Sequence, residues 1–124
     1  MKVCNLSFGK IVVLNKNLAE VIVNEGVHFN EAMVDEYHNF LLSNLSKPFA
    51  LLVNKKHSYS YAFEAQKQIS SLSGIQAIAV VVFTSASLMA TKTLMNVNRT
   101  ETSNIKIFQD RDKALLWLIE EINS

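Results

Sequence analysis

A polar stretch near the middle of the chain carries the side chains best suited to binding an anion. Three consecutive residues that carry or can acquire positive charge, Lys55, Lys56 and His57, precede two hydroxyl groups, Ser58 and Ser60. A helix is expected to begin at these residues, and the free backbone N–H groups of a helix start favour negative charge. The stretch therefore predicts a site for an anion or for an acidic side chain of a partner. The alternative is that Ser60 only caps the helix and the lysines are solvated.

A second group of hydroxyl side chains follows the most apolar run of the chain. Ser85 and Ser87 lie at the start of a predicted helix that also carries Met89 and Met95, whose flexible side chains adapt to varied surfaces. Ligands of parallel sheets bind outside the carboxyl ends of the strands, so this helix start and residues 54–60 are expected to share one rim. The alternative is that these hydroxyl groups only make local hydrogen bonds.

No metal, cofactor or catalytic chemistry is predicted. The three histidines, His28, His38 and His57, lie in different expected elements and lack the spacing of a zinc site. The chain has no Gly-x-Ser-x-Gly sequence and no glycine-rich phosphate loop, and it contains only 3 glycines. We therefore expect a protein that is not an enzyme.

The apolar run itself predicts the centre of the fold. Residues 75–83 read Ile-Gln-Ala-Ile-Ala-Val-Val-Val-Phe, which is too short to cross a membrane and too continuous for a strand with one face in water. We expect a central strand with neighbours on both sides and helices on both faces. The other strands are expected at residues 10–14, 18–23, 49–53 and 105–108.

Residues with helical spacing separate these strands. One helix is expected between an Asn30 cap and Pro48, a second around Tyr61 until Gly74, a third after Thr84, and a fourth after an Asp110 cap. The expected order is β-β-α-β-α-β-α-β-α, an α/β fold with a mixed sheet. The predicted inner faces of the second and third helices are Tyr61, Ala65, Ile69 and Leu72, and Leu88, Thr91, Leu94 and Met95, and residues 96–104 are expected to be a loop.

Length and composition limit the classes of protein that the chain can represent. It has 124 residues and 49% hydrophobic content, which fits one domain spanning residues 1–124. The 12 Lys and Arg nearly balance the 11 Asp and Glu, so no nucleic-acid partner is expected. The single cysteine, Cys4, and a start without the apolar core of a secretory signal predict a cytoplasmic protein with no membrane span.

The C-terminal part of the chain resembles the ending of a known bacterial family. The residues concerned are Phe108, Gln109, Asp110, Ala114, Trp117 and Leu118. They are similar to the Phe-x-Asp…Ala…Trp-Leu ending of SpoIIAA-like proteins, relatives of the STAS domain of anti-sigma-factor antagonists, and the expected element order matches over nearly the whole chain. The resemblance implies a small cytoplasmic module that acts by binding a protein partner. Some relatives are thought to bind apolar or nucleotide ligands.

The same resemblance implies candidate phosphoacceptors. STAS antagonists carry Asp-Ser-Ser-Gly at the start of the second helix, where phosphorylation of a serine changes partner affinity. Here the matching point lies within residues 54–61, where neither the aspartate nor the glycine is present. Ser58 and Ser60 are the serines near that position.

Two functions of different classes follow as predictions. The first is a non-enzymatic regulatory or interaction module resembling STAS-type antagonists. The second is a carrier of a small apolar ligand or lipid, in which the sheet and the helix bearing Met89 and Met95 part to admit the ligand. The strands expected at residues 10–14 and 18–23 should form a hairpin, and a homodimer is expected if Tyr59, Phe63 or this hairpin leaves an apolar patch uncovered.

Overall fold

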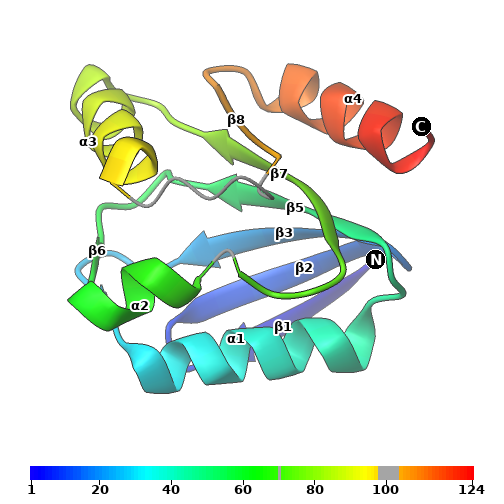
Figure 1. The fold of residues 1–124 in the computed structure, drawn as a ribbon, viewed down its shortest axis with the longest axis horizontal. Coiled ribbons are helices and arrows are strands. Elements are labelled where there is room, and N and C mark those ends of the chain that lie inside the picture. The colour runs from blue at the N-terminus through cyan, green and yellow to red at the C-terminus, as the bar shows by residue number, and fades with distance from the viewer. Residues whose placement is uncertain (70, 98–103) are drawn as a thin grey trace.

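The computed structural model describes residues 1–69, 71–97 and 104–124, without the side chains of residues 94–97. It is an α/β fold in which one mixed sheet lies between helices (Figure 1). In chain order the strands and helices are β1 Lys2–Leu6, β2 Gly9–Asn15, β3 Leu18–Val23, β4 His28–Phe29, α1 Glu31–Asn44, β5 Phe49–Asn54, β6 Ser60–Tyr61, α2 Phe63–Gln68, β7 Ile75–Val81, α3 Ser85–Val97, β8 Ile105–Phe108 and α4 Arg111–Ile122.

The main sheet combines antiparallel and parallel pairing. Its strand order is β1-β2-β3-β5-β7-β8. β1 and β2, and β2 and β3, are antiparallel, whereas β3, β5, β7 and β8 are parallel. The carboxyl ends of these four strands therefore lie along one edge of the sheet. The short strands β4 and β6, which follow the carboxyl ends of β3 and β5, pair with each other in parallel.

β7 is the central strand that the apolar run predicts. It pairs with β5 on one side and with β8 on the other. Its side chains alternate: Ile78 and Val80 enter the core beneath α1 and α2, whereas Ala77 and Ala79 enter the core beneath α4. The prediction of a strand with two neighbours and cover on both faces is confirmed.

The helices cover the two faces unequally. α1, α2 and the start of α3 contribute to one core, in which Phe8, Phe29 and Tyr37 have ring centroids 4.7, 6.2 and 6.3 Å apart. α4 packs on the other face, over β5, β7 and β8 (Figure 1). Small side chains such as Ala50 and Ala79 line the sheet there, so the helix can lie close to it.

Side-chain caps set the starts of three helices. The Oδ1 atom of Asn30 accepts a hydrogen bond from the backbone of Met33 at 3.0 Å, and Asp110 accepts from the first turn of α4. Thr84 Oγ1 accepts from the backbone of Ser87 at 3.0 Å. Each cap satisfies a backbone N–H that has no partner within the helix, and the predicted Asn30 and Asp110 caps are confirmed.

Three strands were not predicted. β1 is an edge strand whose Lys-Val-Cys-Asn-Leu sequence shows no clear alternation of apolar and polar residues. β4 and β6 have two residues each, and only their pairing with one another makes them strands. The order β-β-α-β-α-β-α-β-α is therefore incomplete, although each element that it names is present.

Several predicted boundaries were also wrong. α2 begins at Phe63 and ends at Gln68, because Tyr61 is engaged in β6 and Ala62 provides no side-chain cap. Leu72 consequently lies beyond the helix. β7 ends at Val81, two residues before the end of the strand predicted at residues 75–83.

The third helix and the loop after it differ from the prediction as well. α3 continues to Val97, through the first two residues of the predicted loop 96–104. Residues 98–103 of that loop lie outside the described residues, as do the side chains of Leu94 and Met95.

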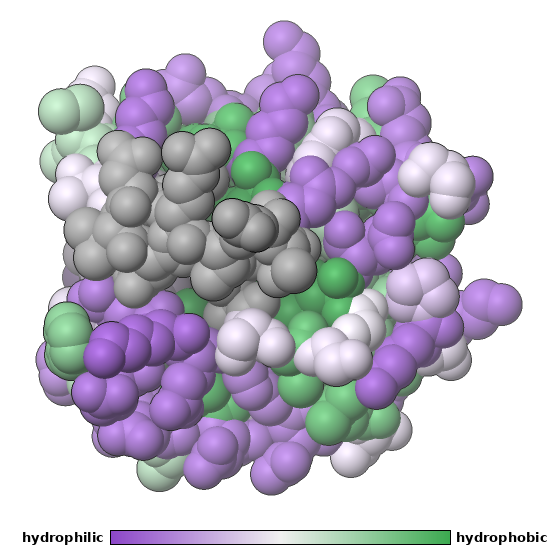
Figure 2. Space-filling view, in the orientation of Figure 1, coloured by the Kyte–Doolittle hydropathy of each residue, from purple (hydrophilic) through white to green (hydrophobic). Residues whose placement is uncertain are grey.

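The surface mixes polar and apolar residues. On the face shown in Figure 2, apolar residues reach the surface in separate places among hydrophilic ones. The most exposed large apolar side chains, apart from Met1, include Phe63 at 66%, Met89 at 65% and Phe83 at 55%. Phe63 and Met89 lie in α2 and α3, and Phe83 lies in the connection from β7 to α3, so all three are near the carboxyl edge of the parallel strands and beside the predicted rim.

Candidate functional site

The carboxyl ends of β5 and β7 form the predicted rim. Asn54 at the end of β5 pairs with Val81 at the end of β7, and the backbone N–H of Lys55 donates to the carbonyl of Val81 at 2.9 Å. Residues 55–60 and the start of α3 therefore leave the sheet from adjacent points on one edge. Within the described part of the chain, no hydrogen bond joins Ser85 or Ser87 to residues 55–60.

The loop after β5 is attached to the connection between β3 and β4. The backbone N–H of Ser58 donates to a carboxylate oxygen of Glu25 at 3.1 Å, and the carbonyl of Ser58 accepts from Gly26 at 2.7 Å. The Ser60 hydroxyl and His28 Nδ1 are 2.9 Å apart. Ser60 belongs to β6 and is paired with His28 of β4, and α2 begins after Ala62, so the expectation that Ser60 caps the second helix is wrong.

Lys55 is half-buried between aromatic rings. Its Nζ atom lies 4.6 Å from the centroid of the Tyr59 ring and 5.4 Å from that of Tyr61. No ion pair joins it to a carboxylate in the part of the chain that the structure describes. Burial lowers the pKa of Lys55 to about 8, because the charged ammonium loses hydration. The alternative that both lysines are solvated is therefore wrong for Lys55, whereas Lys56 is exposed.

Tyrosine hydroxyl groups gather next to this lysine. The Tyr59 and Tyr61 hydroxyl oxygens are 3.3 Å apart. Burial, with the neighbouring Tyr61, raises the pKa of Tyr59 and that of Tyr37 on α1. Burial likewise raises the pKa of Tyr61, which the hydrogen bond with Tyr59 lowers in part. All three phenols are neutral at physiological pH, so none supplies a negative charge to Lys55.

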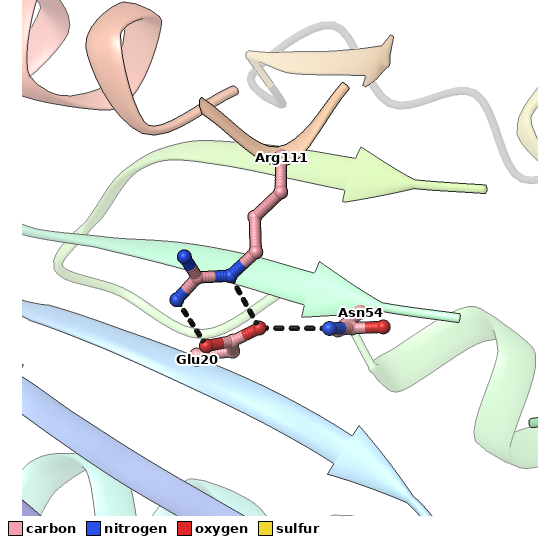
Figure 3. Close-up of polar contacts among 3 residues, drawn as sticks. All are labelled: Glu20, Asn54 and Arg111. Carbon is pink, nitrogen blue, oxygen red and sulfur yellow. Dashed lines mark hydrogen bonds and ion pairs between the residues drawn. The ribbon is translucent and has the colours of Figure 1, made fainter. Parts of the chain in front are cut away.

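A second polar cluster lies on the opposite side of the same strand end. Glu20 on β3 is 5% exposed, and its carboxylate accepts hydrogen bonds from Arg111 at 2.7 and 3.1 Å and from the Asn54 amide at 2.9 Å (Figure 3). Asn54 Oδ1 in turn accepts from the backbone of Lys56 at 3.1 Å. The cluster thus joins β3, β5 and α4.

The hydrogen bonds of this cluster keep Glu20 ionised. Burial raises the pKa of Glu20, but the hydrogen bonds from Arg111 and Asn54 and the charges of Arg111 and Lys56 outweigh burial, so the pKa lies below its ordinary value. Hydrogen bonding to the Glu20 carboxylate also raises the pKa of Arg111. Because the carboxylate is already occupied by three donors, its role is structural.

The pairing of Glu20 with Arg111 was not predicted from the sequence. A usable signal was present, since Glu20 is the only charged residue of the strand that reads Leu-Ala-Glu-Val-Ile-Val. A charge inside such an apolar strand requires a partner. The identity of the partner was not accessible, because Arg111 lies 91 residues later in the chain.

Among the residues whose placement is described, no three His, Cys, Asp or Glu side chains form a group able to hold a metal ion. No helix in the described ranges has the length and apolar character needed to span a membrane.

Comparison with known proteins found no matching family model, no matching curated protein and no matching solved structure. The resemblance to SpoIIAA-like proteins therefore stays a prediction.

Proposed function

We propose that this protein is a non-enzymatic interaction module that binds a protein partner through the carboxyl edge of its parallel strands. The observation that carries the proposal is the exposure of Phe63 on α2, Met89 on α3 and Phe83 on the connection between β7 and α3, all near that edge. Large apolar side chains that are exposed around one edge are typical of interaction surfaces.

Basic groups at this edge indicate the character of the partner. Lys67 Nζ lies 4.3 Å from the centroid of the Phe63 ring and 3.7 Å from a carboxylate oxygen of Glu64, and Lys56 is exposed on the loop after β5. Because Glu64 partly balances the charge of Lys67, this surface favours a partner segment that is mainly apolar and carries a few acidic residues. The resemblance to STAS-type antagonists supports the same class of function.

Phosphorylation at this edge is part of the proposal. Ser58 and Ser60 are both exposed, and the Ser60 hydroxyl is held by His28 at 2.9 Å. A phosphate on Ser60 would replace that hydroxyl contact and add a charge of about −2 at a basic surface. We expect such a charge to weaken binding of an acidic partner.

The carrier remains the second prediction and is less favoured. In a carrier, Met89 would line a ligand cavity between α3 and the sheet, but this side chain is 65% exposed. A carrier would retain an apolar ligand during purification.

The experiment compares the proteins bound by three forms of the chain. Wild type, a Phe63→Ala/Phe83→Ala variant and a Leu42→Ala control are used as bait in cells, and bound proteins are quantified by mass spectrometry. Leu42 is 46% exposed on α1, away from the carboxyl edge. A partner lost by the double variant and kept by the control is then purified, and its affinity for each form is measured.

The outcome separates the two functions. At least a tenfold loss of affinity in the double variant, with no change in the Leu42→Ala control, supports the interaction module. Equal binding by all three forms contradicts it. Native mass spectrometry that detects a retained apolar ligand instead of a partner would favour the carrier.

A further inference from the structure

The outer edge of the main sheet at β1 is open. In the described ranges β1 pairs with β2 alone, and it ends the strand order of the sheet (Figure 1). Val3 in this strand is 55% exposed. The strand contains no proline and its pairing with β2 contains no bulge, so it lacks two of the features that protect an edge strand from pairing with another chain.

The free backbone groups of this edge belong to Val3 and Asn5. The carbonyl of Phe8 accepts a backbone hydrogen bond of 2.9 Å from the residue that follows β3, so Phe8 faces β3. Backbone groups of successive strand residues point to opposite sides, so Gly9 faces β1, where it pairs with Leu6. The same alternation directs every second residue of β1 toward β2. It leaves the N–H and carbonyl groups of Val3 and Asn5 at the outer edge.

These free groups are complementary to those of a second copy of β1. An antiparallel pair that matches all 5 residues of the strand places Val3 opposite Asn5 of the second copy, and the two-fold axis repeats this pair. Each of the two pairs joins free groups to free groups and can exchange both backbone hydrogen bonds. A shift by one residue would instead place free groups opposite groups already bonded to β2. The full overlap therefore puts the two-fold axis at Cys4.

Charged side chains match in the same arrangement. Lys2 would lie opposite Leu6 of the second copy, on the face that α1 covers, because Leu6 packs in that core. Next to Leu6, the backbone N–H of Ser7 donates to a carboxylate oxygen of Glu36 at 3.3 Å, and the Ser7 hydroxyl also donates to this carboxylate. Neither Lys2 nor Glu36 forms an ion pair within the part of one copy that the structure describes. The ammonium group of one copy can therefore reach the carboxylate of the other, twice by symmetry.

We propose that two copies of this chain associate through β1, which pairs antiparallel with β1 of the second copy and joins the two sheets into one. The pairing covers Val3 and places it diagonally beside Val3 of the second copy. β1 is not among the parallel strands whose carboxyl ends form the proposed partner site, so the two surfaces are independent. A contact of one short strand from each copy is small, so we expect a reversible dimer with a Kd on the order of 10 μM.

Sedimentation velocity of the full chain between about 5 and 500 μM measures this association. Val3→Pro removes a free N–H group, and proline is tolerated on an edge strand whose N–H faces outward, so the fold should be kept. Lys2→Glu tests the ion pair and leaves the backbone unchanged, so it decides the question even if proline disturbs the strand. Lys113→Glu, the same charge change at an exposed position of α4, is the matched control. Circular dichroism checks the fold of each variant.

We expect wild type and Lys113→Glu to dimerise with the same Kd and Val3→Pro to lose at least about tenfold in affinity. Lys2→Glu should lose about threefold, and adding Glu36→Lys should restore the affinity. Because Cys4 is the only cysteine, oxidation with diamide should link two wild-type copies through it, and Val3→Pro copies far more slowly. A wild type that stays monomeric throughout the concentration range overturns the proposal, as does a dimer that neither Val3→Pro nor Lys2→Glu weakens. Neither result bears on binding of the partner at the carboxyl edge.

Discussion

Arg111 at the start of α4 donates two hydrogen bonds, of 2.7 and 3.1 Å, to Glu20 on β3. The two residues are 91 positions apart in the chain. α4 packs over β5, β7 and β8, so this pair extends its attachment to a fourth strand, β3. The Glu20 side chain is buried and ionised. The guanidinium group of Arg111 therefore offsets the free-energy cost of burying this charge.

Replacing Arg111 by Met should lower the free energy of unfolding by about 2 kcal/mol. The variant leaves a buried carboxylate with the Asn54 amide as its remaining side-chain donor. The expected loss is below the range for fully buried pairs because 40% of the Arg111 side chain is exposed. Urea unfolding of Arg111→Met, Glu20→Gln and the double variant gives the coupling energy, which should be about 1–2 kcal/mol. Strictly additive losses would show that the two side chains do not stabilise each other.

The same pair should make stability depend on acidic pH. The folded-state pKa of Glu20 lies below its ordinary value of 4.5, so the stabilisation is complete above pH 4.5 and is lost as the pH falls through the folded-state pKa. The difference in unfolding free energy between wild type and the double variant should therefore shrink below pH 4.5. A difference that stays constant from pH 7 to pH 3 would contradict this assignment.

Lys55→Met should stabilise the protein at neutral pH. The folded-state pKa of Lys55 is about 8, below its ordinary value of 10.5, so the cost of burying the charge is fully present below pH 8. This cost falls as the pH rises from 8 to 10.5. We expect the variant to be about 1 kcal/mol more stable than wild type at pH 7, because removing the buried charge gains more than losing the contacts of the ammonium group with the aromatic rings costs. This gain in stability should disappear toward pH 10. Urea titrations at pH 7, 8.5 and 10 test this, and an advantage that grows with pH would exclude a buried ammonium.

Gly9→Ala should destabilise the sheet strongly. A Cβ atom at this position would lie 2.1 Å from the carbonyl oxygen of Ile22 and 2.9 Å from the Cα atom of Val23, so backbone must move. The expected cost is about 3 kcal/mol or more. Gly26→Ala is the matched control: it has no atom within 4 Å of the new Cβ, and its φ of +79° should cost only about 1 kcal/mol. Equal losses in thermal unfolding would contradict the close approach at Gly9.

Two phenylalanines should respond differently to truncation. Phe8 is fully buried with its ring centroid 4.7 Å from that of Phe29, so Phe8→Ala should cost about 3–5 kcal/mol. Phe63 is 66% exposed, so Phe63→Ala should change stability by less than about 0.5 kcal/mol. Denaturant unfolding measures both. A large loss at Phe63 would mean that this side chain serves the fold and not a binding surface.

Local patterns in the sequence determined much of the architecture. The apolar run at residues 75–83 predicted a central strand, because only burial on both faces suits such a sequence. Asn30 and Asp110 predicted two helix starts, because a cap and the amides that it binds are at most three residues apart. Signals of this kind depend on neighbours in the chain and are visible without coordinates.

The properties of the candidate site were decided by the tertiary structure. The sequence indicated that Lys55 and Ser60 belong to a polar stretch, but the pairing of β6 with β4 turns Ser60 toward His28 and Tyr61 toward the core. Lys55 loses hydration only because this arrangement places aromatic rings beside it. Likewise, Glu20 obtains its guanidinium partner only when α4 folds back over the sheet. Burial and charge pairing arise between segments far apart in the chain, and therefore only the folded protein determines them.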